Sequence, residues 1–363
     1  MNTFGKNVRV TIFGESHGAA IGCTLEGLPA GFKLDMEALN AFLARRAPGG
    51  QGLLTTQRKE KDQPEILSGI QDGVLTGATL CAIIRNGDQH SKDYSNLKDC
   101  PRPGHSDYPA AVKFHGYNDI RGGGIFSGRL TAPICIAGGI LRQILEKEEG
   151  IVIGAHLAQI AQVGDDVFDP VKVSAAALRR LDKKEFPVLC DEAGEMMKRE
   201  VEAARMSCDS VGGVVEAAVV GMPPGIGDPM FYGLENRLSQ ALFAIPAVKG
   251  VSFGDGFYAS MVHGSENNDP YVIDGKGRVR TVTNHCGGIL GGMSTGMPIV
   301  FRAAFKPTSS IARPQQSISL SRKEVQELRV VGRHDPCVAI RAVPVVIAAT
   351  ALALYDALRE PRP

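Results

Sequence analysis

The sequence of 363 residues contains no tryptophan, and its formal net charge is only +1, from 40 basic and 39 acidic residues. A protein that binds nucleic acid through a strong basic field is therefore not expected, and an anionic ligand would have to meet local clusters of positive charge. The longest apolar run, 342–355, is shorter than the roughly 20 residues of a membrane-spanning helix and is rich in alanine. We expect neither a nucleic acid nor a membrane as a partner.

The eight cysteines are scattered, and no two of them form a C-x-x-C pair. This spacing argues against a zinc ribbon or a thioredoxin-like motif, and the chain is much longer than a typical disulfide scaffold. The first residues contain no apolar stretch of the kind found in secretory signal peptides. We therefore expect a reduced, cytoplasmic setting.

Hydrophobic periodicity predicts strands and helices that come in runs, without the strict alternation of a doubly wound sheet. No repeat, low-complexity tract or linker divides the chain, so we predict a single α+β domain over residues 1–363. Strands are expected at 8–12, 20–25, 65–70, 79–84, 151–160, 214–220 and 298–305, with a hairpin around 274–277. Helices are expected at 36–46 (with Asp35 as N-cap), 127–148, 191–205, 234–245 and 344–358, the last starting at Pro344 and apolar nearly all round.

Three loops that are far apart in the sequence share one chemistry. They are Gly14–Gly18, Arg102–Asp107 and Gly332–Cys337, and each contains a histidine beside other polar or charged side chains. In the third loop Pro336 holds Asp335 in an extended or turn conformation, because a proline disfavours the α region for the preceding residue. Their common character predicts a single assembled site.

Several local clusters could bind an anion. Arg45 and Arg46 end the first predicted helix, where a favourable interaction with the helix dipole is the preferred explanation and an anion clamp shared with Arg58 and Lys59 is the alternative. Glycine-rich loops at 121–124 and 285–292 allow close backbone approach to a ligand. The segment Lys306–Ser310 combines a lysine with hydroxyl groups, a composition that suits either phosphate binding or an ordinary turn.

Two kinds of chemistry fit these residues. The first is proton transfer on a phosphorylated, anionic substrate that lies beside a flat cofactor. The second is metal-dependent hydrolysis, in which histidine and aspartate would hold a divalent ion, although no H-x-H or H-E-x-x-H motif is present. The polar stretch 86–98 has the length of a lid that could exclude water and oxygen.

Several of these segments together resemble the chorismate synthase family. Gly14–Gly18 matches the first histidine motif of that family and Arg102–His105 matches the second. The similarity continues at the end of the chain and covers essentially its whole length. The further matching segments are 55–58, 65–69, 284–292, 306–310, 332–338 and 341–344.

The resemblance implies conversion of 5-enolpyruvylshikimate 3-phosphate to chorismate and phosphate by a carbon–oxygen lyase. This 1,4-elimination requires reduced FMN without net redox change, and NADPH is a possible reductant. The resemblance also implies a β-α-β sandwich, in which helices lie between two antiparallel sheets, and assembly as a homotetramer in the cytoplasm.

It also implies roles for individual residues. His17 would lie at the substrate phosphate, His105 near the flavin N1 and C2 carbonyl, and Asp335 would handle the proton at flavin N5 with Ser16 and Ser127 as relays. Arg46 matches a position associated with NADP. The contacts to FMN would come from Ser127, Ala247, Gly291, Lys306, Pro307, Thr308, Ser309, Ser310 and Arg333.

The segment 122–129 departs from the family pattern. Where that family usually has Gly-Gly-Gly-Arg-Ser-Ser-Ala-Arg, this chain has Gly122-Gly123-Gly124-Ile125-Phe126-Ser127-Gly128-Arg129. Two expected polar contacts to the flavin are thus replaced by apolar residues, Ile125 and Phe126. Backbone groups could still serve there, and Phe126 could pack on the ring.

Overall fold

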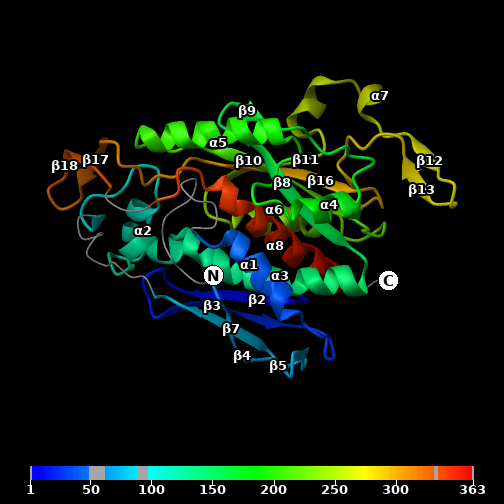
Figure 1. Cartoon of the computed structure of the whole chain (residues 1–363), viewed down its shortest axis with the longest axis horizontal. Helices are drawn as coiled ribbons and strands as arrows, with labels where there is room; N and C mark the ends of the chain where they lie inside the picture. The colour runs from blue at the N-terminus through cyan, green and yellow to red at the C-terminus, as the bar shows by residue number, and fades with distance from the viewer. Residues whose placement is uncertain (1, 49–61, 88–96, 331–333, 362–363) are drawn as a thin grey trace.

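The structure is a computed structural model that describes residues 2–48, 62–87, 97–330 and 334–361. Its main body consists of two five-stranded sheets with helices between them (Figure 1). All the strand pairs in both sheets are antiparallel. The predicted α+β class and β-α-β sandwich are therefore confirmed.

The first sheet has the order β1-β2-β3-β7-β4 and the second has the order β11-β16-β10-β8-β9. β3 lies where a strand was predicted at 20–25, and its side chains Ile21, Cys23 and Leu25 are buried and face the helices. The bounds are β1 Thr3–Phe4, β2 Arg9–Gly14, β3 Ala20–Glu26, β4 Glu65–Ser68, β7 Leu80–Arg85, β8 Val152–Ile160, β9 Val163–Gly164, β10 Gly213–Val220, β11 Val248–Phe253 and β16 Ile299–Phe305.

Four helices form the middle layer: α1 (Met36–Arg46), α3 (Thr131–Glu148), α6 (Leu234–Phe243) and α8 (Ala339–Leu358). α8 is buried on all sides except at Arg341, so its length and hydropathy mark a core helix and not a membrane span. It crosses α3 very closely, since a Cβ added at Gly138 would lie 2.4 Å from the Cα of Ala348. The two helices are held together by this contact and by the apolar faces of both sheets.

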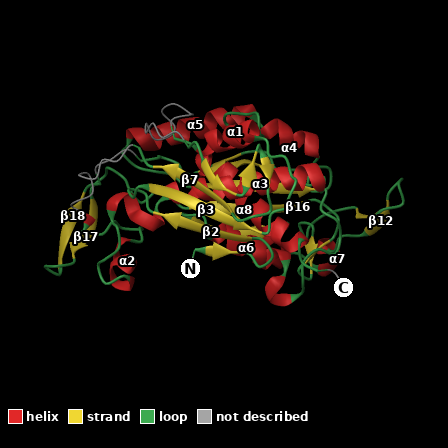
Figure 2. Ribbon diagram, turned by 90° about the horizontal axis from the view of Figure 1, so that it is seen from below, coloured by secondary structure: helices red, strands yellow, loops and turns green. Residues whose placement is uncertain are grey.

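Shorter elements surround this body. α4 (Ala175–Leu181) and α5 (Asp191–Met206) lie on the outer side of the second sheet, and α2 (Asp107–Lys113) lies beside the first (Figures 1 and 2). The β17–β18 hairpin projects at one end of the molecule and the β12–β13 hairpin and α7 at the other. The remaining bounds are β5 Ile70–Gln71, β6 Val74–Leu75, α7 Gly264–Asn267, β12 Tyr271–Ile273, β13 Val279–Thr281, β14 Ile289–Leu290, β15 Met293–Ser294, β17 Gln315–Ser319 and β18 Glu324–Leu328.

Two predicted helix starts are wrong. α8 begins at Ala339, so Pro344 stands in its second turn instead of its first. The apolar residues upstream extend the helix, and burial of its whole circumference outweighs the hydrogen bond that proline cannot donate. α3 begins at Thr131, because Ser127 caps a separate 3-10 turn, Gly128–Leu130, by accepting a hydrogen bond from the amide of Arg129 at 3.3 Å.

Candidate active site

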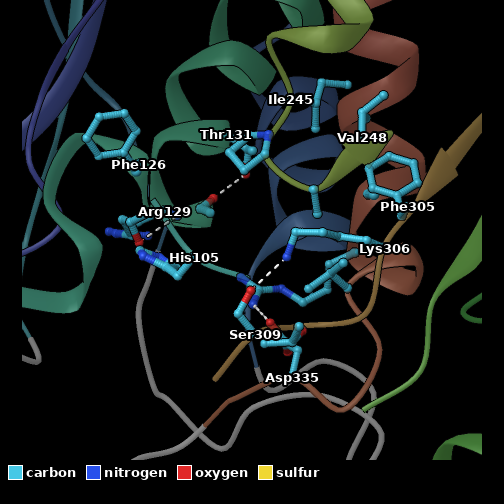
Figure 3. Close-up of a pocket in the computed structure, with 18 of the residues that line it drawn as sticks. His105, Phe126, Arg129, Thr131, Ile245, Val248, Phe305, Lys306, Ser309 and Asp335 are labelled. Carbon is cyan, nitrogen blue, oxygen red and sulfur yellow. Dashed lines mark hydrogen bonds and ion pairs between the residues drawn. The ribbon is translucent and has the colours of Figure 1, made fainter. Parts of the chain in front are cut away.

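A cavity of about 670 Å³ opens between the ends of the middle helices and the loops that follow both sheets (Figure 3). One wall is apolar and the opposite side carries charged and hydroxyl groups, a composition typical of small-molecule sites. The apolar wall comes from the α6–β11 junction, β16 and α8, with Ile245, Val248, Phe305, Val338 and Val345. The polar side comes from Arg46, Arg102, His105, Ser127, Arg129, Lys306, Ser309, Ser310, His334, Asp335 and Arg341.

His105 lies in the cavity wall and is held from behind by Asp107 and Arg102. Its Nδ1 lies 2.6 Å from Oδ1 of Asp107, and Asp107 also accepts hydrogen bonds from the Nε of Arg102 at 2.7 Å and from its backbone N–H at 3.0 Å. Among the described residues none bonds to Nε2 of His105, whose side chain is 18% exposed. The contact between Nδ1 and the carboxylate therefore fixes the ring and leaves Nε2 as the nitrogen that a ligand can meet.

Asp107 remains ionised although it is buried. Burial opposes the charged form, but the hydrogen bonds from Arg102 and His105 outweigh it and lower the pKa of this carboxyl. Arg102 also donates to Ser310 Oγ at 3.0 Å. The second histidine loop is thereby tied to the segment Lys306–Ser310.

Ser16 and His17 are buried behind the cavity wall and are not among the residues that line it. Gly122, which does line the cavity, separates them from it: a Cβ added at Gly122 would lie 2.4 Å from Nδ1 of His17 and 2.7 Å from Oγ of Ser16. With φ of +59° this position also has a backbone conformation that favours glycine. The structure thus brings the first histidine loop to the back of the cavity wall at Gly122.

Asp335 is fixed by α8. Its Oδ2 accepts a hydrogen bond from Arg341 at 2.6 Å, and the Nε of Arg341 donates to the carbonyl oxygen of Arg46 at 2.9 Å. Burial lowers the pKa of Arg341 in spite of the opposing effect of Asp335. The third loop and the end of α1 are therefore joined through a single guanidinium.

Arg45 and Arg46 each bind a carboxylate from another part of the chain. Arg46 pairs with Asp62, which also pairs with Arg129, and all three side chains are buried. Arg45 pairs with Asp182 at 2.6 Å on the side away from the cavity. The charge–dipole explanation does not account for these partners, and Arg58 and Lys59 lie outside the described residues.

The segment Lys306–Ser310 lines the cavity through all its members except Pro307. Lys306 donates to Ser309 Oγ at 2.7 Å, and its backbone N–H donates to the carbonyl oxygen of Ala247 at 2.9 Å. Burial and the neighbouring Lys249 lower the pKa of Lys306. The Oγ1 of Thr308 is buried and has no hydrogen-bond partner among the described residues, so it can accept or donate toward a ligand.

Other predicted positions are not brought to the cavity or cannot be placed. Gly291 lies in the exposed turn between β14 and β15, away from the residues that line it. Arg333 and most of the predicted lid 86–98 lie outside the described residues. Ile125 and Phe126 do line the cavity, and Phe126 packs 6.4 Å from the ring of Phe114.

Four residues of this site were not predicted to be functional: Asp62, Asp107, Arg129 and Arg341. Asp107 follows His105 by two residues, so the motif itself contained a signal for an oriented histidine. Asp62 carried no comparable signal, because its two partners are 16 and 67 residues away. Within the described residues, no group of three or more histidine, cysteine, aspartate or glutamate side chains is arranged to hold a metal ion.

Comparison with known proteins decides the family. The sequence model described as chorismate synthase matches residues 8–358. The chain belongs to the chorismate synthase family. It is 46% identical over 368 residues to the chorismate synthase of Lancefieldella parvula, covering 98% of this chain and 96% of that protein, and 46% identical over 359 residues to that of Thermococcus kodakarensis, covering 99% and 98%.

A crystal structure of a chorismate synthase has the same fold. It superposes with a TM-score of 0.76 at 28% identity and covers 98% of this chain and 92% of the other. The chain is therefore a carbon–oxygen lyase that acts on a small molecule, converting 5-enolpyruvylshikimate 3-phosphate to chorismate and phosphate. This reaction is the last common step toward the aromatic amino acids.

Proposed function

We propose that the cavity is where this elimination takes place and that it binds reduced FMN together with the substrate. The observation that supports this most directly is the convergence of the predicted loops: His105, Asp335 and the segment Lys306–Ser310 share one cavity, with His17 directly behind Gly122. A site that combines fixed cations with a water-poor apolar wall suits the departure of a phosphate group.

The residues of the cavity fit FMN. The apolar wall offers a surface for the flat ring, and Phe126 replaces a polar contact by an aromatic one. Lys306, Ser309 and Ser310 with the unpartnered hydroxyl of Thr308 provide a cation and hydroxyl donors for a phosphate. Ser127 and Ala247 also line this cavity, while Gly291, Pro307 and Arg333 stay predictions as FMN contacts.

Reduced FMN supplies an electron-rich ring that assists the loss of phosphate and accepts the hydrogen removed from the substrate. Around it, we expect His105 to present Nε2 to the flavin pyrimidine, because Asp107 occupies Nδ1. Asp335, oriented by Arg341, would hold the proton near flavin N5 with Ser16 and Ser127 as relays. His17 would neutralise the leaving phosphate.

NADPH as the reductant of the flavin, and Arg46 as its contact, remain part of this proposal. Arg46 lines the cavity, but its side chain is only 3% exposed and is bound to Asp62. We therefore expect chemically reduced FMN to support full turnover, and a test with NADPH alone to show whether this chain reduces its own flavin.

A homotetramer in the cytoplasm also belongs to the proposal. Many large apolar side chains between residues 230 and 293 are exposed, and this stretch includes the projecting β12–β13 hairpin. Exposed apolar surface does not stabilise a monomer, whereas contact between identical subunits would bury it. The exposed residues include Met230, Phe231, Phe257, Met261, Tyr271 and Ile273. Analytical ultracentrifugation should give four subunits, and a monomer would contradict the assembly.

An anaerobic assay tests the proposed site. With reduced FMN and 5-enolpyruvylshikimate 3-phosphate, the enzyme should release chorismate and phosphate in equal amounts, and a chelator should leave both unchanged. Asp335→Ala and His17→Ala should each lower kcat by about 10²-fold or more while the Kd for FMN changes little. Phosphate without chorismate would instead favour the metal-dependent hydrolase, and an equal loss of FMN affinity would make the two residues structural.

A further inference from the structure

Lys249 lines the cavity although it belongs to none of the predicted site segments. It is the second residue of β11 and stands at a break in the pairing of this strand with β16. Val248 is paired with Phe305 of β16. The next pair joins Gly250 to Ala304, so the register leaves Lys249 without a partner of its own. This arrangement is a β-bulge, in which one strand contains one residue more than its neighbour.

The bulge decides on which face of the sheet this lysine lies. In an unbroken ladder Lys249 would be the partner of Ala304, whose side chain points away from that of Phe305 because successive side chains of a strand alternate. Phe305 and Val248 both line the cavity (Figure 3), whereas Ala304 does not. Because of the extra residue, Lys249 lines the cavity together with Val248. A regular strand would have directed its ammonium group to the other face.

The backbone just before the bulge is also unusual. Ala247 has a φ of +75°, a left-handed conformation that is unfavourable for a residue with a side chain. Its carbonyl oxygen accepts a hydrogen bond from the N–H of Lys306 at 2.9 Å, which ties this turn to the end of β16. Bulges and strained backbone conformations are concentrated at functional sites, where they direct side chains toward ligands. The start of β11 therefore has the backbone of a binding site.

Lys249 adds a second ammonium group to the cavity wall near Lys306. Burial and the charge of Lys249 both lower the pKa of Lys306, so the two ammonium groups are close enough to repel each other. Lys306 donates to the Oγ of Ser309 at 2.7 Å (Figure 3). Of the described carboxylates only that of Asp335 lines the cavity, and it is bound to Arg341 at 2.6 Å. The repulsion between the lysines would be relieved by an anion bound between them.

A phosphate group fits the surroundings of the two lysines. The Oγ1 of Thr308 is buried in the same segment as Lys306 and has no hydrogen-bond partner among the described residues. A phosphate monoester carries a charge of about −1.5 to −2 at pH 7 and has three strong acceptor oxygens. Two ammonium groups and one hydroxyl group match both this charge and these acceptors.

We propose that Lys249 is a further cofactor-binding residue, which the β-bulge directs to the phosphate of FMN beside Lys306 and which makes the enzyme prefer FMN to riboflavin. This proposal rests on the assignment of the cavity as the FMN site. Riboflavin has the same ring system but ends in an uncharged hydroxyl group, so it leaves the repulsion between the two lysines in place. The phosphate end of the cofactor, and not its ring, therefore determines which flavin is bound.

Lys249→Met tests this assignment, because it removes the charge and retains an unbranched side chain. Lys249 is exposed, so the substitution should leave the fold intact. Titrations followed by flavin fluorescence should show that the Kd for FMN rises about tenfold, while the Kd for riboflavin changes less than about twofold. Lys249→Arg keeps the positive charge and should hold the Kd for FMN within about threefold of wild type.

Lys276→Met is the matched control. Lys276 is also an exposed lysine, but it lies in the turn between β12 and β13 and does not line the cavity. Its loss changes the net charge by the same amount. Because charges far from a ligand are screened by salt, this variant should bind both flavins within about twofold of wild type.

Three results would overturn the proposal. The first is wild-type enzyme that binds FMN and riboflavin equally well. The second is an equal loss of affinity for both flavins in Lys249→Met, which would make the lysine part of the cavity shape only. The third is an unchanged Kd for FMN in that variant; a raised Kd for 5-enolpyruvylshikimate 3-phosphate would then assign the lysine to the substrate phosphate. Wild-type enzyme that binds neither flavin would instead overturn the proposed FMN site, so the two failures are distinguishable.

Discussion

His105 and His156 are both bound through Nδ1 to an aspartate, yet they occupy opposite situations. His105 lies in the cavity wall with Asp107 at 2.6 Å. His156 lies on β8, on the outer face of the second sheet, with Asp165 at 2.9 Å and a second carboxylate, Glu216, at 3.0 Å from Nε2. It is completely buried, whereas His105 keeps part of its surface open.

The difference shows that a histidine–aspartate pair can either orient a catalytic side chain or stabilise the fold. The two carboxylates of His156 also accept the backbone N–H groups of Phe168, Leu189 and Cys190, so the imidazole fastens two loops to the sheet. Burial disfavours a charged ring there, but the hydrogen bonds to the carboxylates outweigh it and raise the pKa of His156. A histidine with both nitrogens bound stabilises structure, and one with a nitrogen left toward a cavity can act on a ligand.

Removing each imidazole should separate the two roles most clearly. His105→Ala should lower kcat by about 10²-fold or more with little change in stability. His156→Ala removes the cation that Asp165 and Glu216 share and leaves Glu216 with Arg302 as its remaining basic partner, so the free energy of unfolding should fall by about 3–5 kcal/mol while kcat stays within twofold. Anaerobic turnover and urea unfolding measure the two quantities. A similar loss of kcat in both variants would break the distinction.

Changing the aspartates tests the orientation of the rings. An asparagine at position 107 can donate to Nδ1 of His105 and so move the ring proton to Nε2, which should lower kcat about 10- to 100-fold. Asp107→Glu, which retains a carboxylate, should recover part of this loss. Asp165→Asn is the control and should affect unfolding but not turnover. Full activity of Asp107→Asn would show that the orientation of His105 is unimportant.

The pH dependence of stability gives the smallest expected effect. Because the pKa of His156 is raised on folding, the folded state keeps its proton above about pH 6.5, where the unfolded chain loses it. The contribution of this group is therefore fully present below pH 6.5 and is lost as pH rises through the folded pKa, with a slope of at most about 1.4 kcal/mol per pH unit. Urea unfolding between pH 6 and 9 should show a flatter profile for His156→Gln, and an identical slope would contradict this assignment.

Most strands of the two sheets were predicted from the sequence, but β1, β9 and β11 were not, and the sandwich was inferred from the family resemblance. Of the three predicted histidine loops, the second and third line the cavity, whereas the first lies behind Gly122. The extended pattern at 20–25 and the motif around His105 are local signals: the strand is confirmed as β3, and His105 lines the cavity, while its role stays a prediction. The partner of Arg46 could not be predicted in this way, because a helix-terminal arginine looks the same with or without a distant carboxylate. The start of α8 was missed for a related reason: burial by the rest of the fold, and not local preference, decides it.

The partners of charged side chains were the hardest feature to predict from the sequence. Asp107 follows His105 by two residues, whereas Asp165 and Glu216 are 9 and 60 residues from His156 and meet it only after the sheet has formed. Asp62 and Asp182 are equally indistinguishable before folding, although the arginines bound to Asp62 line the cavity and those bound to Asp182 do not. Residue type predicts that such groups will find partners, and the tertiary structure decides which of them face a ligand.

The position of α8 at the end of the chain has a consequence for folding during synthesis. Every strand of both sheets precedes this helix in the chain, and yet it fills the space between them. During synthesis from the N-terminus, the apolar faces of the two sheets therefore cannot pack on α8 until residues 339–358 have left the ribosome. A nascent chain at this stage has a large unsatisfied apolar surface, which is the kind of surface that chaperones bind.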